Sequence, residues 1–339
     1  MASTLGTFVG GTSYLEEGKQ RFTFDVLDLD TDEVQRIPLD FLAHGFAVKP
    51  GAPQVAAVFE KRGPGAALLD LRAMKLVSKI RGKASRAYYG HGVYDREGEN
   101  LYVVETDLDT HRGVVSVRET TTYKEIDAFP THGDNPHDCV AIDDGKVLVF
   151  TNGGGRIGEG EPSVTYVEVA TRKLLEKVTF TDPKVNAGHL VIGRDGSLVV
   201  VSAPRDGLPE HTSAGAIHLR SGKRKPERMR APKVTARIVG ESLSACLHEP
   251  SGVVGVTHPH GGIVAFWSMK SHKLVAFHEA EAPRGIALSR DGSTWVVAFG
   301  KHASIRLLDV HTFEPHDRTY GTTRLSGSHV FPYEPVTSP

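Results

Sequence analysis

The chain has 339 residues, of which 39% are hydrophobic and 24% are charged, and its formal net charge at pH 7 is −1. Such a composition supports a large hydrophobic core, either in one large β domain or in two smaller ones. The balanced charge argues against nucleic acid or an acidic membrane surface as the main partner, because phosphate binding needs clustered basic charge.

Neither membrane insertion nor a disulfide framework is expected. No apolar run approaches the ~18 residues of a membrane-spanning helix. The first residues, MASTLGTFVGG, lack the basic and apolar regions of a signal peptide. Two cysteines, Cys139 and Cys246, are too few for a disulfide framework and form no Cys-x-x-Cys motif, so we expect both to pack in the core.

The first 80 residues predict short β-strands in succession. Runs rich in Val, Ile and Phe alternate with turns rich in Gly, Pro, Asp and Asn, which is typical of strands and not of helices. The predicted strands cover residues 7–11, 22–30 and 33–40, and then residues 45–48, 55–59, 66–71 and 76–80.

The second group, of four strands, recurs along the chain at a period of about 47 residues, which is the spacing of β-propeller blades. Each repeat begins at an anchor residue directly before or at its first strand. The anchors are His44, His91, His137, His189, Ser244, Arg284 and His329. We therefore predict one seven-bladed β-propeller domain over residues 1–339, of the WD40-like or YVTN-like type.

The two ends of the chain predict how the propeller closes. After His329 only one strand, HVFPYE, remains, whereas three strands precede His44. We expect the C-terminal strand to pair with the N-terminal strands and complete the last blade, because this pairing removes free sheet edges.

Histidine occupies five of the seven anchor positions, although only 17 of the 339 residues are histidines. The first strand of a propeller blade lines the central channel, so these side chains should gather at one end of it. Neutral imidazole is a common ligand of Fe, Cu and Zn. We predict a transition-metal site, with Fe or Cu favoured and Zn as an alternative, and the predicted ligands are His44, His91, His137, His189 and His329.

A structural role is the competing interpretation of these histidines. WD40 propellers carry a Gly-His pair before the first strand of a blade, and its histidine takes part in a hydrogen-bond network. This chain has Gly90-His91 and Gly188-His189, but the Trp-Asp pair that accompanies such networks is missing.

Further polar residues lie where the loop between the second and third strands of a repeat should reach the same rim. Their carboxylates would orient the histidine rings, and an arginine at an anchor position would bind an anion. The predicted rim residues are Glu60, Glu105, Asp107, Arg112, Asn152, His258, His260 and Arg284.

The stretches HGFAVKPGAP, GHGVYDREGENLYVVETDLDTHRGVVSV, NPHDCVAIDDGKVLVFTNGG and GHLVIGRDG resemble an uncharacterised bacterial family of β-propellers of unknown function. Members commonly carry a twin-arginine export signal and are encoded near imelysin-type iron proteins. The resemblance implies a periplasmic protein that handles metal, with iron-uptake proteins as partners, although a leader is not evident and a cytoplasmic location is the alternative. The matching positions are His44, Glu60, His91, Glu105, Arg112, His137, Asn152 and His189.

Three functions remain open at this point. The first is a binding protein for iron or copper acquisition. The second is a metal-dependent enzyme, either a redox protein or a lactonase-like hydrolase that uses Glu105 as general base. The third is a scaffold for protein interactions, since a propeller fold does not determine its function. The dominance of histidine over carboxylate favours a metal-binding or redox protein over a lactonase-like hydrolase, and of these we expect the non-enzymatic role.

Overall fold

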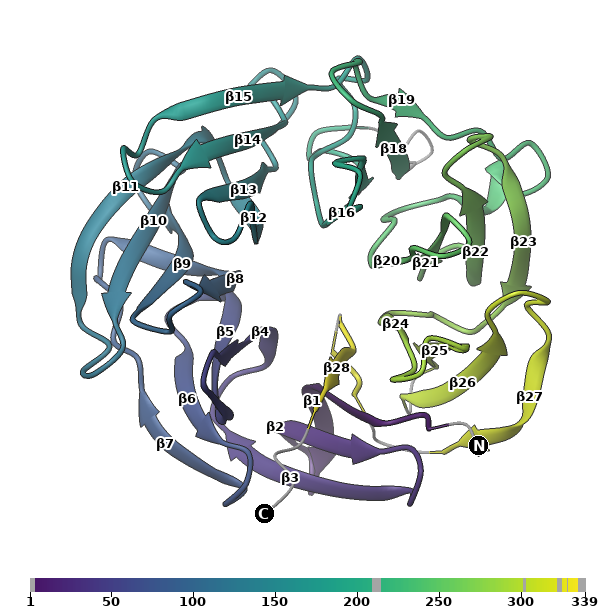
Figure 1. Ribbon diagram of the computed structural model, residues 1–339, viewed down its shortest axis with the longest axis horizontal. Helices are drawn as coiled ribbons and strands as arrows, with labels where there is room; N and C mark the ends of the chain where they lie inside the picture. The colour runs from purple at the N-terminus through teal and green to yellow at the C-terminus, as the bar shows by residue number, and fades with distance from the viewer. Residues whose placement is uncertain (1–3, 209–214, 301–302, 322–324, 328, 335–339) are drawn as a thin grey trace. The chain divides into compact units, whose positions relative to one another are not determined.

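The structure is a computed structural model that describes residues 4–208, 215–300, 303–321, 325–327 and 329–334. These residues form an all-β β-propeller fold, with one short 3-10 helix, η2 (Thr235–Arg237), and the strands labelled in Figure 1. None of the helical residues in these ranges builds a helix long and apolar enough to cross a membrane. The chain groups into two compact units, which are described one at a time, and the single domain stays a prediction.

Unit 1 comprises Met1–Arg36, His189–Pro204 and Leu208–Glu334. It contains three sheets of four sequential antiparallel strands each. These are β16 (Leu190–Ile192), β17 (Leu198–Ser202), β18 (Ala216–Arg220) and β19 (Glu227–Arg228); β20 (Ala245–His248), β21 (Val253–His258), β22 (Ile263–Ser268) and β23 (Leu274–Glu279); and β24 (Ile286–Leu288), β25 (Thr294–Phe299), β26 (Ser304–Asp309) and β27 (Pro315–Tyr320).

A fourth sheet joins the two ends of the chain. Its strand order is β28 (Phe331–Tyr333), β1 (Thr7–Glu16), β2 (Lys19–Asp28) and β3 (Glu33–Leu39), and β3 crosses the sequence boundary of unit 1. Phe331 and Tyr333 of β28 stand opposite Val9 and Thr7 of β1 in an antiparallel ladder. The predicted pairing of the C-terminal strand with the N-terminal strands is therefore confirmed.

Unit 2 comprises Ile37–Gly188 and Arg205–Gly207 among the described residues. One of its sheets has four strands and the other has eight. The first contains β12 (Pro136–Ile142), β13 (Val147–Asn152), β14 (Ser163–Glu168) and β15 (Leu174–Thr179), and the second contains β4 (Ala43–Lys49), β5 (Ala52–Gly63), β6 (Ala66–Asp70), β7 (Lys75–Lys79), β8 (Arg86–Tyr94), β9 (Asn100–Asp107), β10 (Arg112–Glu119) and β11 (Glu125–Asp134).

The prediction of seven separate blades needs correction, because the described residues form five separate four-stranded sheets and one eight-stranded sheet. The physical reason is the length of β5, which has 12 residues, whereas its partner β6 has 5. The protruding end of β5 pairs with the start of β8, with Lys61 opposite Tyr89 and Gly63 opposite Tyr88. Two predicted blades thus share one sheet.

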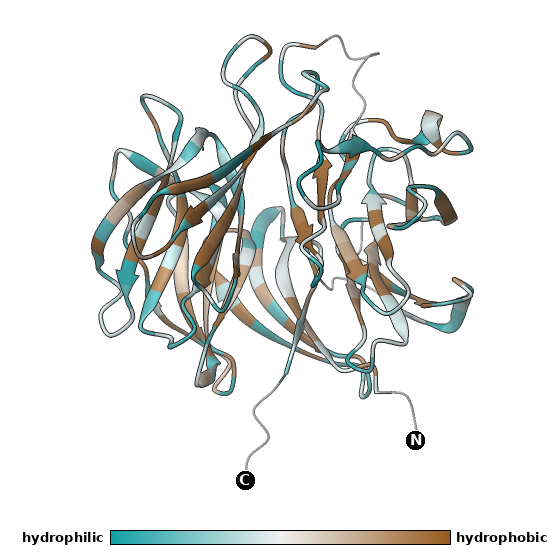
Figure 2. Ribbon diagram, turned by 45° about the horizontal axis from the view of Figure 1, so that its top comes forward, coloured by the Kyte–Doolittle hydropathy of each residue, from teal (hydrophilic) through white to brown (hydrophobic). Residues whose placement is uncertain are grey.

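The hydrophobic core lies between neighbouring sheets within each unit. Consecutive residues of the second and third strands are buried, for example all six residues of β13 and all six of β21, as expected for strands packed on both faces. Figure 2 shows these strands in the colour of hydrophobic residues and many of the turns as hydrophilic. In unit 1 the side chains of Trp267 and Trp295 are fully buried, and in unit 2 those of Phe59 and Phe150 are fully buried. This packing holds the first strand of each sheet in place, together with the anchor histidine in those repeats that have one.

We predict that deletion of all residues after Leu325 lowers the thermal melting midpoint by several degrees. The deletion removes β28, and with it the buried side chains of Val330 and Tyr333, each of which contributes about 1.5–3 kcal/mol by burial. Circular dichroism measures the midpoint, and the exposed substitution Glu334→Gln serves as the control. An unchanged midpoint in the deletion variant would count against closure by this strand.

Candidate metal centre

Three of the predicted histidines gather within unit 2. His44 lies on β4, His91 on β8 and His137 on β12, which are the first strands of three successive repeats. Their ring centroids are 4.9 Å apart for His44 and His91, 5.1 Å for His44 and His137, and 5.4 Å for His91 and His137. All three side chains are buried. We call this group the histidine trio.

Two glycines allow the strands of the trio to approach one another. Gly90 has a positive φ of 107°, and a Cβ atom at this position would lie 2.5 Å from Cδ2 of His44. A Cβ atom on Gly45 would lie 1.9 Å from the carbonyl oxygen of Gly90. Glycine is therefore required at both positions for His44 and His91 to come together.

Asp138 orients one ring of the trio. Its Oδ1 atom lies 3.4 Å from Nδ1 of His91. Burial lowers the pKa of His91, and the nearby carboxylate of Asp138 only partly opposes this effect. A neutral ring whose Nδ1 faces a carboxylate presents Nε2 as the ligand atom, which is the usual arrangement of a metal-binding histidine.

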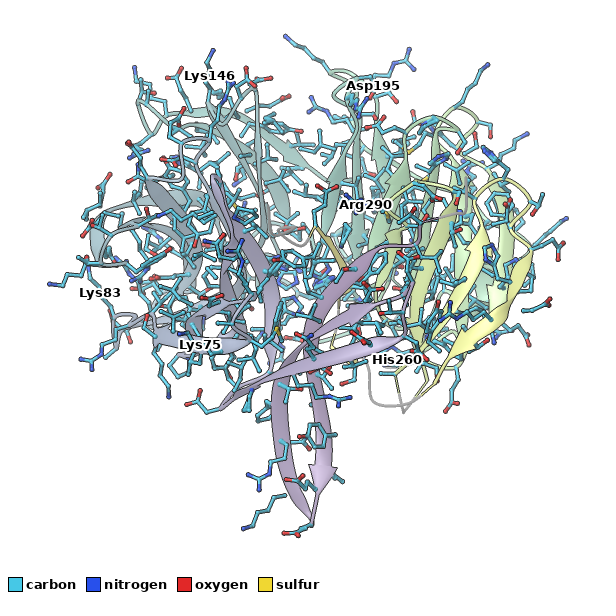
Figure 3. The ribbon with its side chains drawn as sticks, turned by 60° about the horizontal axis from the view of Figure 1, so that its bottom comes forward. Lys75, Lys83, Lys146, Asp195, His260 and Arg290 are labelled. Atoms are coloured by element: carbon cyan, nitrogen blue, oxygen red, sulfur yellow. The ribbon has the colours of Figure 1, made fainter. Side chains whose placement is uncertain are left out.

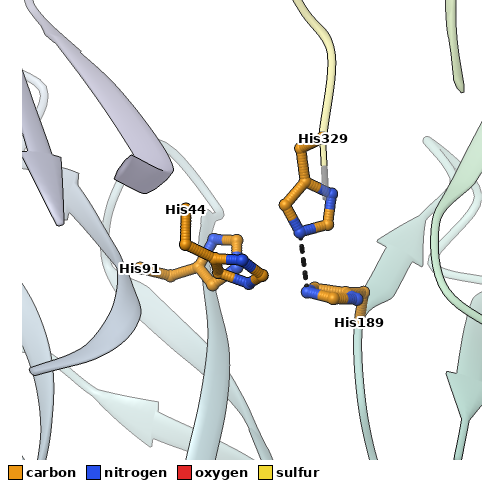
Figure 4. Close-up of side chains that lie close together, drawn as sticks. All are labelled: His44, His91, His189 and His329. Carbon is orange, nitrogen blue, oxygen red and sulfur yellow. Dashed lines mark hydrogen bonds between the residues drawn. The ribbon is translucent and has the colours of Figure 1, made fainter. Parts of the chain in front are cut away.

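The other two predicted histidines gather within unit 1. His189 directly precedes β16, and His329 lies two residues before β28. Their ring centroids are 4.1 Å apart at an interplanar angle of 82°, and their Nε2 atoms are 2.8 Å apart. Figure 4 shows this contact as a dashed line, and it also shows His44 beside His91. Both rings are buried, and we call His189 and His329 the histidine pair.

The hydrogen-bond partners of the histidine pair determine where its protons lie. The carbonyl oxygen of Leu243 is 2.7 Å from Nδ1 of His189, so this nitrogen must donate. In a neutral ring Nε2 of His189 then accepts, and Nε2 of His329 donates to it. Nδ1 of His329 in turn accepts from Oγ of Ser244 at 2.9 Å. The four groups form one continuous chain of hydrogen bonds.

Both members of the pair therefore point Nε2 at a common point and have Nδ1 held by an oxygen atom. A cation between the two Nε2 atoms would replace the shared proton. His329 would then carry its proton on Nδ1 and donate it to Ser244. A carbonyl or hydroxyl oxygen behind Nδ1 is typical of metal-binding histidines. Four of the buried histidines, His44, His91, His189 and His329, could therefore hold a metal ion. The ligand atoms of His44 and His91 lie within 4.8 Å of each other, as do those of His189 and His329, whereas His137 is not among these candidate ligands.

The predicted rim residues of unit 2 take mainly structural roles. Glu60 accepts a hydrogen bond from the backbone N–H of Gly65, and the carboxylate of Asp107 accepts bonds from the backbone and hydroxyl of Thr110, which lower its pKa. Both carboxylates stabilise the turns that follow their strands. Arg112 is exposed at the start of β10.

Glu105 and Asn152 are fully buried and hydrogen-bonded, although Oε2 of Glu105 has no hydrogen-bond donor among the described residues and lies 3.6 Å from Nη1 of Arg86. Oε1 of Glu105 accepts hydrogen bonds from Oγ of Ser116 at 2.6 Å and from Arg118 at 2.9 Å. Asn152 accepts from Thr131 and donates to Thr165. These bonds bind neighbouring strands to one another, so we correct the expectation that Glu105 and Asn152 face a channel rim.

The predicted rim residues of unit 1 also differ from one another. His258 is fully buried in β21, where its ring packs edge-on against Trp267 at 5.6 Å and Nδ1 lies 3.2 Å from Oγ of Ser242. This burial corrects its rim assignment. His260 is exposed in the following turn, as Figure 3 shows. Nε of Arg284 donates to the carbonyl oxygen of Gly327.

Sequence reasoning missed Asp138 and Arg118. Asp138 directly follows His137 and approaches a different ring, that of His91, so only the packing of β8 against β12 shows its role. Arg118 is buried as the ion-pair partner of Glu105, and its position two residues after Ser116 on one strand face was the available signal. The expected packing of Cys139 in the core is confirmed, and burial raises the pKa of its thiol.

His258 predicts a specific pH dependence of stability. Burial lowers its pKa to about 3, so between pH 6.5 and 4 the unfolded chain binds a proton that the folded chain does not. The free energy of unfolding should therefore fall on acidification, by up to ~1.4 kcal/mol per pH unit from this group. Urea unfolding of wild type and His258→Gln measures the effect. The variant should show the flatter profile, and parallel profiles would contradict this assignment.

Comparison with solved structures shows the same fold at low sequence identity. Hydrazine synthase of Kuenenia stuttgartiensis matches with a TM-score of 0.70 and 14% identity over 86% of this chain and 92% of that one. A hypothetical selenium-binding protein from Sulfolobus tokodaii matches with a TM-score of 0.74 and 11% identity over 98% and 93%. The dihydro-haem d1 dehydrogenase NirN in complex with DHE matches with a TM-score of 0.62 and 15% identity over 98% and 76%.

No curated protein matches the chain. A family model does match, over residues 37–320, and this segment holds four of the five predicted histidine ligands, all except His329. The repeat pattern, the β-propeller fold and this match agree with the resemblance found in the sequence. The chain belongs to the family described as "Protein of unknown function (DUF1513)".

Proposed function

We propose that the protein binds a transition-metal ion through the buried histidines at the starts of its first strands. The observation that carries the proposal is the histidine pair. Its two Nε2 atoms are 2.8 Å apart and buried. Each Nδ1 is hydrogen-bonded to an oxygen atom, and such a bond usually orients the ring of a metal-binding histidine. The histidine trio, with Asp138 behind His91, supplies a second set of imidazole ligands.

The geometry of the pair supports some metals better than others. Two nitrogens that each lie ~2.1 Å from one ion are ~3.0 Å apart at adjacent corners of an octahedron or square, and ~4.2 Å apart in a linear complex. The observed Nε2–Nε2 distance of 2.8 Å would have to increase only slightly for the two nitrogens to occupy adjacent positions around one ion. Ferrous iron or Cu(II) therefore fits better than linear Cu(I), and tetrahedral Zn needs a somewhat larger opening.

We propose iron, or copper, as the ion and acquisition or handling of that ion in the periplasm as the role. The support comes from the family resemblance, which associates these propellers with export and with iron-uptake proteins. Haem, which the printed name of one structural neighbour mentions, is not proposed, because Nε2 atoms 2.8 Å apart leave no room for a porphyrin between them.

Binding without turnover is better supported than hydrolysis. The hydrolase hypothesis assigned the general base to Glu105, but this carboxylate is buried and accepts bonds from Arg118 and Ser116. These bonds hold the carboxylate within the sheet, whereas a general base has to reach a metal-bound water.

We also propose that the propeller has seven repeats. The eight-stranded sheet consists of two successive four-stranded groups, β4–β7 and β8–β11, each paired in the order of the single sheets. Only the two residue pairs at the end of β5 join them. Each group therefore corresponds to one repeat of the sequence.

Metal content tests the proposed function. Purified wild type incubated with Fe(II), Cu(II) or Zn(II), and then freed of loosely bound metal, should retain about one ion per chain or more by elemental analysis. The double variants His91→Ala/His137→Ala and His189→Ala/His329→Ala should each lose metal. The exposed substitution His260→Ala is the matched control and should retain it. Negligible metal in wild type would return the histidines to a structural role and favour a scaffold for protein interactions.

Ser244 predicts a graded effect on the same site. It touches Nδ1 of His329 and would orient this ring without binding the ion. Ser244→Ala should therefore weaken metal binding ~10–100-fold while the melting midpoint of the metal-free protein changes little. The exposed substitution Ser271→Ala is the control. Equal affinities of the two variants in a competition titration with a chromogenic chelator would show that the proposed orientation is wrong.

A further inference from the structure

A cavity of about 450 Å³ lies in unit 2 where the end of β5 meets the start of β8. Its apolar wall includes Pro64 and Leu108. Four charged side chains also line it, three of them cationic, and these are Arg62, Lys83, Arg86 and Glu105. The cavity is in the size range of small-molecule sites, which combine apolar walls with a few charged groups.

The negative charge near this cavity is already engaged. Glu105 is fully buried, accepts bonds from Arg118 and Ser116, and its Oε2 lies 3.6 Å from Nη1 of Arg86. Glu125, outside the cavity wall, accepts from Nζ of Lys83 at 2.8 Å and from Nη1 of Arg86 at 3.3 Å, so two cations share its one carboxylate. The cavity wall therefore carries an excess of positive charge.

The guanidinium of Arg62 is oriented by Tyr89 in a way that would allow it to bind a ligand. Its backbone adopts the left-handed conformation, with φ of 61°, which non-glycine residues rarely adopt and which is often found at binding sites. Nε donates to the hydroxyl of Tyr89 at 2.9 Å, and the guanidinium lies 5.4 Å from the centroid of the same ring. In the described part of the chain no acceptor is bound to its two terminal nitrogens. These nitrogens form the planar fork that binds a carboxylate through two hydrogen bonds.

We propose that this cavity binds a small organic polycarboxylate. One carboxylate would lie on the fork of Arg62, and a second would be attracted mainly by the exposed Lys83, because Arg86 already pairs with both Glu105 and Glu125. The apolar wall at Pro64 and Leu108 favours an anion with a carbon skeleton over inorganic phosphate, which would leave that wall in contact with water. The ring of Tyr89, which holds Arg62, also packs edge-on against His137 of the histidine trio at 6.0 Å.

Isothermal titration calorimetry of the metal-free protein tests this site independently of the proposed metal function. Citrate should bind with a Kd below ~1 mM, and phosphate should bind at least tenfold more weakly. Arg62→Gln should weaken citrate binding at least tenfold, because it removes the charged fork. Lys75→Gln is the control, since Lys75 is an exposed cation outside the cavity, labelled with Lys83 in Figure 3.

Arg62 is exposed and pairs with no carboxylate among the described residues, so Arg62→Gln should fold, and its melting midpoint verifies this. Three outcomes would overturn the proposal. The first is no citrate binding to wild type at 1 mM ligand. The second is equal affinity for citrate and phosphate, which would show that charge alone is recognised. The third is equal citrate affinity of Arg62→Gln and Lys75→Gln.

Discussion

Two neutral imidazole rings can face each other through ring nitrogens only if a proton or a cation lies between these nitrogens. His189 and His329 meet this condition with a shared proton. The carbonyl oxygen of Leu243 and the hydroxyl of Ser244 determine where each proton lies along this series of hydrogen bonds. The arrangement is buried, so water cannot take over these bonds. The histidine pair is thus a site where a metal ion could replace a proton with little movement of the rings.

The rest of the fold serves to position these rings. Large side chains such as Trp267 and Phe150 fill the space between sheets and keep their strands straight and fixed. Where the first strands approach one another, the absence of a Cβ atom at Gly45 and Gly90 allows the rings of His44 and His91 to lie side by side. Buried polar groups away from the histidines, such as Glu105 with Arg118, satisfy one another and join strands. The carboxylate of Glu105, which the sequence suggested as a general base at the rim of the channel, therefore takes part in structural hydrogen bonds.

The sequence predicted the strands, the closure by β28 and the grouping of the histidines, because alternation of apolar residues, turn residues and a repeat period are all local signals. It did not predict the joining of two repeats in one sheet, since this depends on how far β5 extends past β6. Nor did it show that His258 is buried, because a histidine at a strand end has the same local pattern whether its ring faces solvent or the core. The partnership of Asp138 with His91 arises from packing between strands that are far apart in sequence.

X-ray absorption spectroscopy at the iron edge of the ferrous-loaded protein tests the central claim most directly, because it detects the ligands of the bound ion itself. The account predicts nitrogen ligands at ~2.1 Å, with the outer-sphere scattering of at least two imidazole rings. This imidazole scattering should decrease in His189→Ala/His329→Ala, which removes both Nε2 ligands of the pair. A spectrum with oxygen ligands alone, or one that is unchanged in this variant, would contradict a metal centre built on the histidine pair.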